Sequence, residues 1–250
     1  MKLANSSHQY YLENTQYSEF LESQNLSAFS KYIEAIKNHA SPEQKVLDVG
    51  CGTGIVLQGL KRLGFKKMVG MEISRTSVEV CKKKGFDCYQ YGGFTFPFDD
   101  QNFDLVGSIN VLEHTDNPIK FLDEQYRVLK RNGYLIVACP NFLSTTNSYH
   151  KHTRGIANKV RNAIMLMRYA FTKEFSFKKM EMTIRTPFQP DDDAVNVTNP
   201  IQLTSWAKMR KMHIVYTSAF QAKKTGLLEF LDHTPLRVFF GSCFYILQKK

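Results

Sequence analysis

Short apolar segments alternate with helical patterns between residues 45 and 139, and this alternation restricts the possible fold more than any other feature of the sequence. The apolar segments lie at 45–50, 67–72, 86–90, 103–108 and 134–139. Helical patterns separate them at 55–63, 75–84 and 117–132, the last with Asn117 as N-cap and Pro118 in its first turn. Strands that alternate with helices form a parallel sheet covered on both faces, and right-handed crossovers make it doubly wound. The sequence therefore predicts a doubly wound α/β fold.

The regions that flank this alternation suggest how the rest of the chain is organised. Residues 1–40 combine aromatic side chains with an apolar helical stripe, and we expect a helical lid there, joined to one α/β domain over 41–250. Residues 141–200 break the rhythm and are predicted to be a helical insertion after the fifth strand. A helix at 201–211, a strand at 213–218 and a last strand at 237–248 complete the expected domain.

Composition excludes several classes of protein. No apolar run approaches the roughly 20 residues that span a bilayer, and the polar start of the chain is typical of a cytoplasmic protein. The five cysteines and the pair His150 and His152 lack the spacing of a zinc site, so no metal is expected and the thiols should be reduced and mostly buried. Neither composition nor motif indicates an oligomeric state.

The net charge of +10 is concentrated in one segment, because residues 151–185 hold nine Lys or Arg and two Glu. This segment is open to three interpretations: a solvated helix face, a cap that attracts an anionic substrate, or an amphipathic helix on an anionic membrane. The apolar side of that helix would comprise Ile156, Val160, Ile164, Met167 and Phe171. We favour a substrate cap with a preference for anions, such as a phosphate-linked sugar or lipid carrier. Nucleic acid is disfavoured, because few aromatic residues lie among the basic ones.

The segment from Asp48 to Gly54, Asp-Val-Gly-Cys-Gly-Thr-Gly, lies on the first strand-to-helix turn. Glycines at alternate positions let a ligand approach the backbone, and open α/β sheets bind ligands at this edge. A dinucleotide site needs G-x-G-x-x-G, but here the third glycine comes one residue early and Ile55 takes its place. Asp48, two residues before the first glycine, favours a ligand with a cationic amino-acid end. Glu72, at the end of the second strand, is placed to accept both hydroxyls of a ribose.

These motifs resemble those of the class I S-adenosylmethionine-dependent methyltransferases, in the branch of quinone- and glycan-pathway enzymes. The resemblance covers about 45–141 and is carried by VLDVGCGTG, GMEIS, FPFDDQNFDLV, NVLEH and RVLKRNGYLIVACPN. It implies a seven-stranded sheet with an antiparallel last strand and S-adenosylmethionine as cofactor. The cofactor-binding residues that it implies are Asp48, Gly50, Cys51, Gly52 and Gly54 for the methionine end, Glu72 for the ribose, Ile73, Gly93 and Phe94 near the adenine, and Asn110 and Val111 under the sulfonium. The chain departs from the family at Gly92, where an acidic residue usually binds the adenine amino group.

Methyl transfer requires the acceptor within about 3 Å of the methyl group, and a hydroxyl acceptor also needs a base. His114, after the fourth strand, is the candidate base; the alternative is that Glu113 and His114 only organise their loop. His150 and His152 are weaker candidates. Tyr10, Tyr11 and Tyr17 are candidates for a lid over the cofactor, with ordinary packing as the alternative.

The sequence thus predicts methyl transfer from S-adenosylmethionine to a small-molecule, glycan or lipid-linked acceptor, at oxygen. The alternatives are a catalytically silent S-adenosylmethionine-binding protein and an NAD-dependent oxidoreductase. The glycine spacing disfavours the oxidoreductase.

Overall fold

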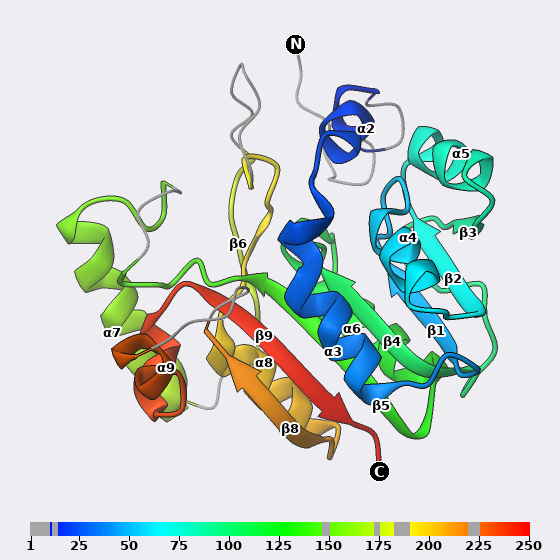
Figure 1. Ribbon diagram of the computed structural model, residues 1–250. Helices are drawn as coiled ribbons and strands as arrows, with labels where there is room; N and C mark the ends of the chain where they lie inside the picture. The colour runs from blue at the N-terminus through cyan, green and yellow to red at the C-terminus, as the bar shows by residue number, and fades with distance from the viewer. Residues whose placement is uncertain (1–10, 12–14, 147–150, 173–175, 183–190, 220–225) are drawn as a thin grey trace.

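A seven-stranded sheet forms the centre of the described part of the chain (Figure 1). The computed structural model describes residue 11 and residues 15–146, 151–172, 176–182, 191–219 and 226–250. The strands follow the order β3-β2-β1-β4-β5-β9-β8, and β9 is antiparallel to both of its neighbours. Their bounds are β1 (Lys45–Val49), β2 (Lys67–Glu72), β3 (Asp87–Gln90), β4 (Phe103–Ile109), β5 (Leu129–Pro140), β8 (His213–Ser218) and β9 (Ser242–Gln248). The predicted fold, including the antiparallel last strand, is confirmed.

Helices cover both faces of this sheet because its central strands are apolar on both sides. On one face, α3 (Ser30–His39) and α4 (Ile55–Arg62) share a core cluster with Val46 and Ile136. On the other face, α6 (Pro118–Val128) and α8 (Pro200–Met209) pack in a cluster with Val49 and Val137. The helix α5 (Arg75–Lys83) lies beside β2 and β3. Burial on both faces explains why the strands appear in the sequence as continuous apolar runs.

The helix ends follow their capping signals. The side chain of Asn117 accepts a hydrogen bond from the Lys120 amide, and Pro118 occupies the first turn, as predicted. The asparagine and proline at 199 and 200 start α8 in the same way. Gly64 and Gly85 follow α4 and α5 with φ of +87° and +81°, the left-handed conformation that ends a helix.

The boundary between α6 and β5 differs from the sequence-based expectation. The helical pattern continues to residue 132, but α6 ends at Val128 and β5 begins at Leu129. Leu129 pairs with Phe103 of β4, and the Asn102 amide donates to the Val128 carbonyl. Pairing with a distant strand therefore overrides the local helical periodicity at these residues.

The predicted insertion at 141–200 contains more than a helix. Its helix α7 spans Ile156–Thr172, and the strands β6 (Lys178–Lys179) and β7 (Asn196–Val197) form a second, two-stranded sheet. The predicted strand at 237–248 is shorter than expected: α9 (Leu227–Asp232) and η3 (Pro235–Phe239) precede β9. Over the N-terminal segment the structure describes α2 (Thr15–Glu22) and η1 (Leu26–Phe29) before α3. Among the described helices, none combines the length and apolar character that crossing a bilayer requires.

Candidate functional site

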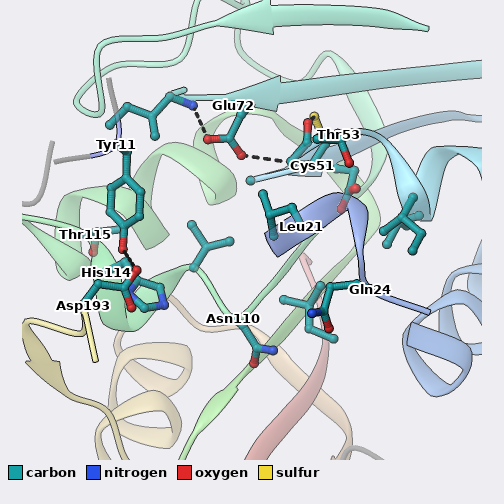
Figure 2. Close-up of a pocket in the computed structure, with 18 of the residues that line it drawn as sticks. Tyr11, Leu21, Gln24, Cys51, Thr53, Glu72, Asn110, His114, Thr115 and Asp193 are labelled. Atoms are coloured by element: carbon teal, nitrogen blue, oxygen red, sulfur yellow. Dashed lines mark hydrogen bonds and ion pairs between the residues drawn. The ribbon is translucent and has the colours of Figure 1, made fainter. Parts of the chain in front are cut away.

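A cavity of about 220 Å³ lies at the carboxyl ends of β1, β2 and β4, on the edge predicted from the sequence (Figure 2). Its walls include nine of the eleven residues predicted to bind the cofactor: Asp48, Gly50, Cys51, Gly52, Glu72, Ile73, Gly93, Asn110 and Val111. Gly54 and Phe94 lie outside this lining. A Cβ on Gly54 would lie 2.9 Å from the Cys81 sulfur, so this glycine allows close helix packing, and Phe94 is 51% exposed.

The glycine turn is shaped by two left-handed residues. Gly50 and Gly52 have φ of +75° and +53°. A Cβ on Gly50 would lie 2.3 Å from a methyl of Val111, and one on Gly52 would lie 2.9 Å from a methyl of Leu21 in α2. The Gly50 amide donates to the Met71 carbonyl at 2.7 Å, which ties the turn to β2. Only glycine fits the space and the backbone conformation at residue 50.

Glu72 lies buried at the end of β2 and organises the amides around it. Its Oε2 accepts a hydrogen bond from the Gly52 amide at 3.0 Å, and its Oε1 accepts from the amides of Ile73 and Ser74 at 2.8 and 3.0 Å (Figure 2). Burial raises the pKa of Glu72, although these three hydrogen bonds favour its charged form. The carboxylate thus joins the glycine turn to the end of β2, with further acceptor capacity on Oε2.

Asp48, 1% exposed, has one satisfied and one unsatisfied oxygen. The Tyr32 hydroxyl donates to Oδ1 at 3.0 Å, whereas Oδ2 has no hydrogen-bond partner within the described structure. Tyr32 reaches this position from α3 across Gly107, where a Cβ would lie 2.2 Å from the tyrosine oxygen. Burial raises the pKa of Asp48 to about 7. A buried carboxylate with a free acceptor favours a cationic ligand group.

Asn110 continues the cavity wall at the end of β4. Its φ of +54° is a left-handed conformation that asparagine tolerates better than most residues, and its amide donates to the Ala138 carbonyl at 2.8 Å. The chain turns sharply here, and the side chain of Val111 lies against Gly50.

His114 lies at the far end of the same cavity among carboxylates. Its Nδ1 lies 3.4 Å from Oδ1 of Asp193, and its Nε2 lies 3.6 Å from Oε1 of Glu113. The Tyr11 hydroxyl donates to the other oxygen of Asp193 at 2.5 Å, and its ring meets the imidazole edge-on at 5.9 Å (Figure 2). Asp191 also lines the cavity. We call Glu113, His114, Asp191 and Asp193 the His114 cluster.

Charge within the His114 cluster shifts its pKa values. Burial lowers the pKa of His114, but Asp193, Glu113 and Asp191 outweigh it and leave the pKa raised. Burial also raises the pKa of Glu113 and, to about 6, that of Asp191. The cluster therefore places a carboxyl group with a pKa of about 6, that of Asp191, beside the imidazole, which suits proton transfer.

Hydrogen bonds from Val195 and from Asn196 of β7 bring the aspartates to this place. The Val195 amide donates to the Glu113 carbonyl at 2.9 Å, and the Asn196 side chain donates to the Thr115 carbonyl at 2.6 Å. Sequence reasoning missed Asp191 and Asp193 as site residues, because the stretch around them shows no periodicity. Their one visible signal was a run of three consecutive acidic residues within the insertion at 141–200.

Two groups of side chains in the described structure could hold a metal ion. Glu113, His114 and Asp191 offer ligand atoms within 4.8 Å of one another, and so do Cys51, Cys81 and Cys88. All five cysteines are free and buried, as expected.

The remaining candidates from the sequence are separate from this cavity. His152 lines a different cavity, next to α7. His150, Tyr10 and the side chain of Tyr17 lie outside the described residues.

Comparison with known proteins agrees with this geometry. Residues 47–137 match the family model of a methyltransferase domain. The chain is 32% identical over 117 residues to a mitochondrial ubiquinone biosynthesis O-methyltransferase of Dictyostelium discoideum, covering 40% of this chain and 36% of that enzyme. An uncharacterized protein of Methanocaldococcus jannaschii is 28% identical over 158 residues, covering 62% of this chain and 74% of that protein.

A similar fold occurs among solved structures. A SAM-dependent methyltransferase from Thermotoga maritima, described as a possible histamine N-methyltransferase, matches with a TM-score of 0.57 and 18% identity, covering 94% of this chain and 95% of that one. The sequence match covers the strands and turns that form the glycine turn, Glu72 and Asn110. Residues 47–137 therefore match a methyltransferase domain, and the fold is the one seen in this solved methyltransferase structure.

Proposed function

We propose that this protein transfers the methyl group of S-adenosylmethionine to a hydroxyl oxygen of a small-molecule, glycan or lipid-linked acceptor. The observation that carries the proposal is that the glycine turn, Glu72 and three members of the His114 cluster (His114, Asp191 and Asp193) line one cavity. A cofactor in the glycine turn and an acceptor at His114 would therefore share the same enclosed space.

The cofactor is proposed to lie along the edge from Asp48 to Glu72. The unsatisfied Oδ2 of Asp48 suits the ammonium of the methionine end, and the free acceptor capacity of Glu72 suits the ribose hydroxyls. The space that a Cβ on Gly50 or Gly52 would fill is available to the methionine part. When bound, S-adenosylmethionine supplies an activated methyl group on a positively charged sulfur.

The acceptor hydroxyl is proposed to lie at His114. The acceptor oxygen forms a bond to the methyl carbon while the carbon–sulfur bond breaks, and the sulfur keeps the electron pair. The hydroxyl proton passes to His114, whose imidazole is oriented by Asp193. Tyr11 in turn holds Asp193 by donating a hydrogen bond to its other oxygen. The products are a methyl ether, S-adenosylhomocysteine and one proton. The O-methyltransferase relative supports oxygen as the acceptor atom.

The acceptor atom can be tested with S-adenosylmethionine that carries a ¹³C-labelled methyl group, incubated with the full chain and fractionated cell extract. We expect one fraction to gain a ¹³C signal with the chemical shift of an O-methyl group. A signal on nitrogen or carbon would refute O-methylation. The absence of transfer in every fraction would favour the catalytically silent protein.

The role of His114 is tested with His114→Gln in the same assay. We expect turnover to fall by about 10²–10⁴-fold while affinity for S-adenosylhomocysteine stays unchanged. His213→Gln is the matched control, because His213 is exposed on β8 and outside the cavity lining. Equal turnover of the two variants would show that His114 only organises its loop.

A further inference from the structure

A second cavity of about 230 Å³ lies between α7, the segment after β5 and the β6–β7 sheet. We call it the basic pocket. Its polar lining is dominated by Lys151, His152, Arg161, Lys178 and Lys179. Glu181 is the acidic residue in this lining. Four of the nine Lys and Arg residues that the sequence concentrates at 151–185 thus line one cavity.

The basic residues lie close enough to act on one another. Burial lowers the pKa of His152, and the charges of Lys151, Arg161 and Lys178 lower it further. Within the described residues, Arg161 and Lys178 take part in no salt bridge. Arg161 and Lys178 therefore add positive charge to the lining that no ion pair in the described part of the chain offsets, and an anion that enters would be attracted to both.

A rigid frame holds the pocket in place. Asn162 of α7 is fully buried, and its amide nitrogen donates to the carbonyls of Phe142, Ser144 and His152 at 3.3, 3.4 and 2.8 Å. The Lys151 ammonium donates to the Glu181 carbonyl at 3.0 Å. These bonds hold α7 against the segment after β5, and they hold the segment before α7 against the residues that follow β6.

Hydrogen bonds join residues around the basic pocket to residues around the cofactor cavity. Lys179 lines the basic pocket and donates to the carbonyl of Asp116 at 2.5 Å, while Asp116 lines the cofactor cavity. Val197 of β7 lines the basic pocket, and the preceding Asn196 is bonded to the loop that holds His114. A ligand anchored in the basic pocket would therefore lie next to residues that also border the proposed methyl acceptor site.

We propose that the basic pocket binds a phosphoryl group of the methyl acceptor, so that the substrate class is phosphate esters or diphosphates. A phosphate group has a charge between −1 and −2 near neutral pH and several acceptor oxygens, and this matches several separate cations better than a single carboxylate does. Asn162 lines the same cavity, and its buried Oδ1 lacks a donor within the described residues, so this oxygen has the capacity to accept from a hydroxyl beside the phosphate. This inference rests on the proposed function only in that the bound phosphate belongs to the acceptor.

The test is calorimetric titration of inorganic pyrophosphate into the full chain saturated with S-adenosylhomocysteine. We expect saturable binding that weakens as salt is added, and at least tenfold weaker binding by Arg161→Glu and by Lys178→Glu. Lys37→Glu on α3 is the matched control, because it makes the same change in net charge at an exposed position far along the chain from the basic pocket. Equal affinities of all three variants, or no binding by the unmodified chain, would overturn the proposal. Retained melting temperature and S-adenosylhomocysteine affinity confirm that each variant is folded.

Two further ligands separate the sources of the phosphoryl group. Stronger binding of glucose 1-phosphate points to a soluble sugar phosphate, and stronger binding of farnesyl phosphate points to a lipid carrier. The pyrophosphate titration involves no turnover, so its outcome is independent of the methyl acceptor. If pyrophosphate binds through Arg161 and Lys178 but no fraction accepts a methyl group, the basic pocket stands and the proposed function fails.

Discussion

At the scale of single residues, Asp48 is a buried carboxyl group whose environment favours a cationic ligand. One of its oxygens is held by Tyr32 and the other has no partner in the described structure, while burial raises the pKa of the carboxyl to about 7. A cation beside Oδ2 would favour the ionised form. Cofactor binding and ionisation of Asp48 should therefore be coupled.

We predict that S-adenosylmethionine binds more tightly as the pH rises from 6 to 8, because only ionised Asp48 pairs with its ammonium. Asp48→Asn should lose at least tenfold in affinity, about 1.4 kcal/mol, and most of this pH dependence. Isothermal titration at several pH values measures both effects. Asp87→Asn, an exposed carboxylate on β3, should behave like the unmodified chain. A pH dependence that survives in Asp48→Asn would contradict this assignment.

The same carboxyl affects folding without ligand. Its pKa in the folded chain lies above the unfolded value of about 3.9, so the folded state holds the proton more tightly. The contribution of Asp48 to stability is therefore present below about pH 4 and is lost as the pH rises through 7. Denaturant titrations of the ligand-free protein between pH 5 and 8 should show a weaker loss of stability in Asp48→Asn. An identical pH slope in both proteins would refute the raised pKa.

The glycine at residue 50 gives a prediction that depends on the space around it and on its backbone conformation. Gly50→Ala places a Cβ 2.3 Å from Val111 at a positive φ, and we expect a loss of about 1–3 kcal/mol in stability together with weaker cofactor binding. Gly92→Ala is the control, because a Cβ there meets nothing within 4 Å and its φ is not positive. Thermal denaturation compares the two variants. Equal melting temperatures would mean that the turn can relax away from Val111.

The sequence predicted some site residues and missed others for a physical reason. Asp48 and Glu72 are recognisable because they occupy fixed positions on a local strand-turn-helix motif. Asp193 lies 79 residues after His114 in an irregular stretch, and Tyr32 acts through a gap at Gly107 that only the packed sheet reveals. Contacts between distant segments have no local pattern, so neither could be read from the sequence.

At the scale of elements, most strands and helices follow the predicted boundaries, since apolar runs and caps are local signals. The exceptions are the early end of α6 and the two-stranded sheet β6–β7, both of which depend on pairing with distant residues. The N-terminal lid stays a prediction. Leu21 of α2 lies against Gly52 and Tyr11 lies at Asp193, which is the arrangement a lid would need.

Helix α7 allows a test of the membrane interpretation. Its residues Ile156, Val160, Ile164, Met167 and Phe171 are 50–85% exposed, and the helix contains no acidic residue. If α7 rests on anionic lipid, the full chain should sediment with phosphatidylglycerol vesicles and not with neutral ones, and Ile164→Asn with Phe171→Asn should reduce the bound fraction several-fold. The melting temperature should stay unchanged because both side chains are exposed. Leu63→Asn, 40% exposed at the end of α4, is the control. Failure to sediment with either kind of vesicle would leave α7 as a solvated face.

At the scale of the whole molecule, the cavity unites β1, β2, β4, α2 and the β6–β7 region, so a ligand there should stabilise the entire fold. We predict that S-adenosylhomocysteine at 100 times its Kd adds about 2.7 kcal/mol, or roughly 5–10 °C in melting temperature. NAD at the same concentration should cause no shift. Differential scanning fluorimetry measures both. A shift with NAD alone would contradict the cofactor assignment.

The contact of Tyr32 with Asp48 through Gly107 makes α3 a participant in ligand affinity as well as a cover for the sheet. Any change that loosens the docking of α3 withdraws the hydroxyl that orients the acid, and by thermodynamic reciprocity a ligand on that acid must tighten α3 against the strands. Helix α3 and the ligand-binding edge of the sheet are therefore energetically coupled through the Tyr32–Asp48 contact, and amide exchange in α3 should slow when a ligand binds beside Asp48.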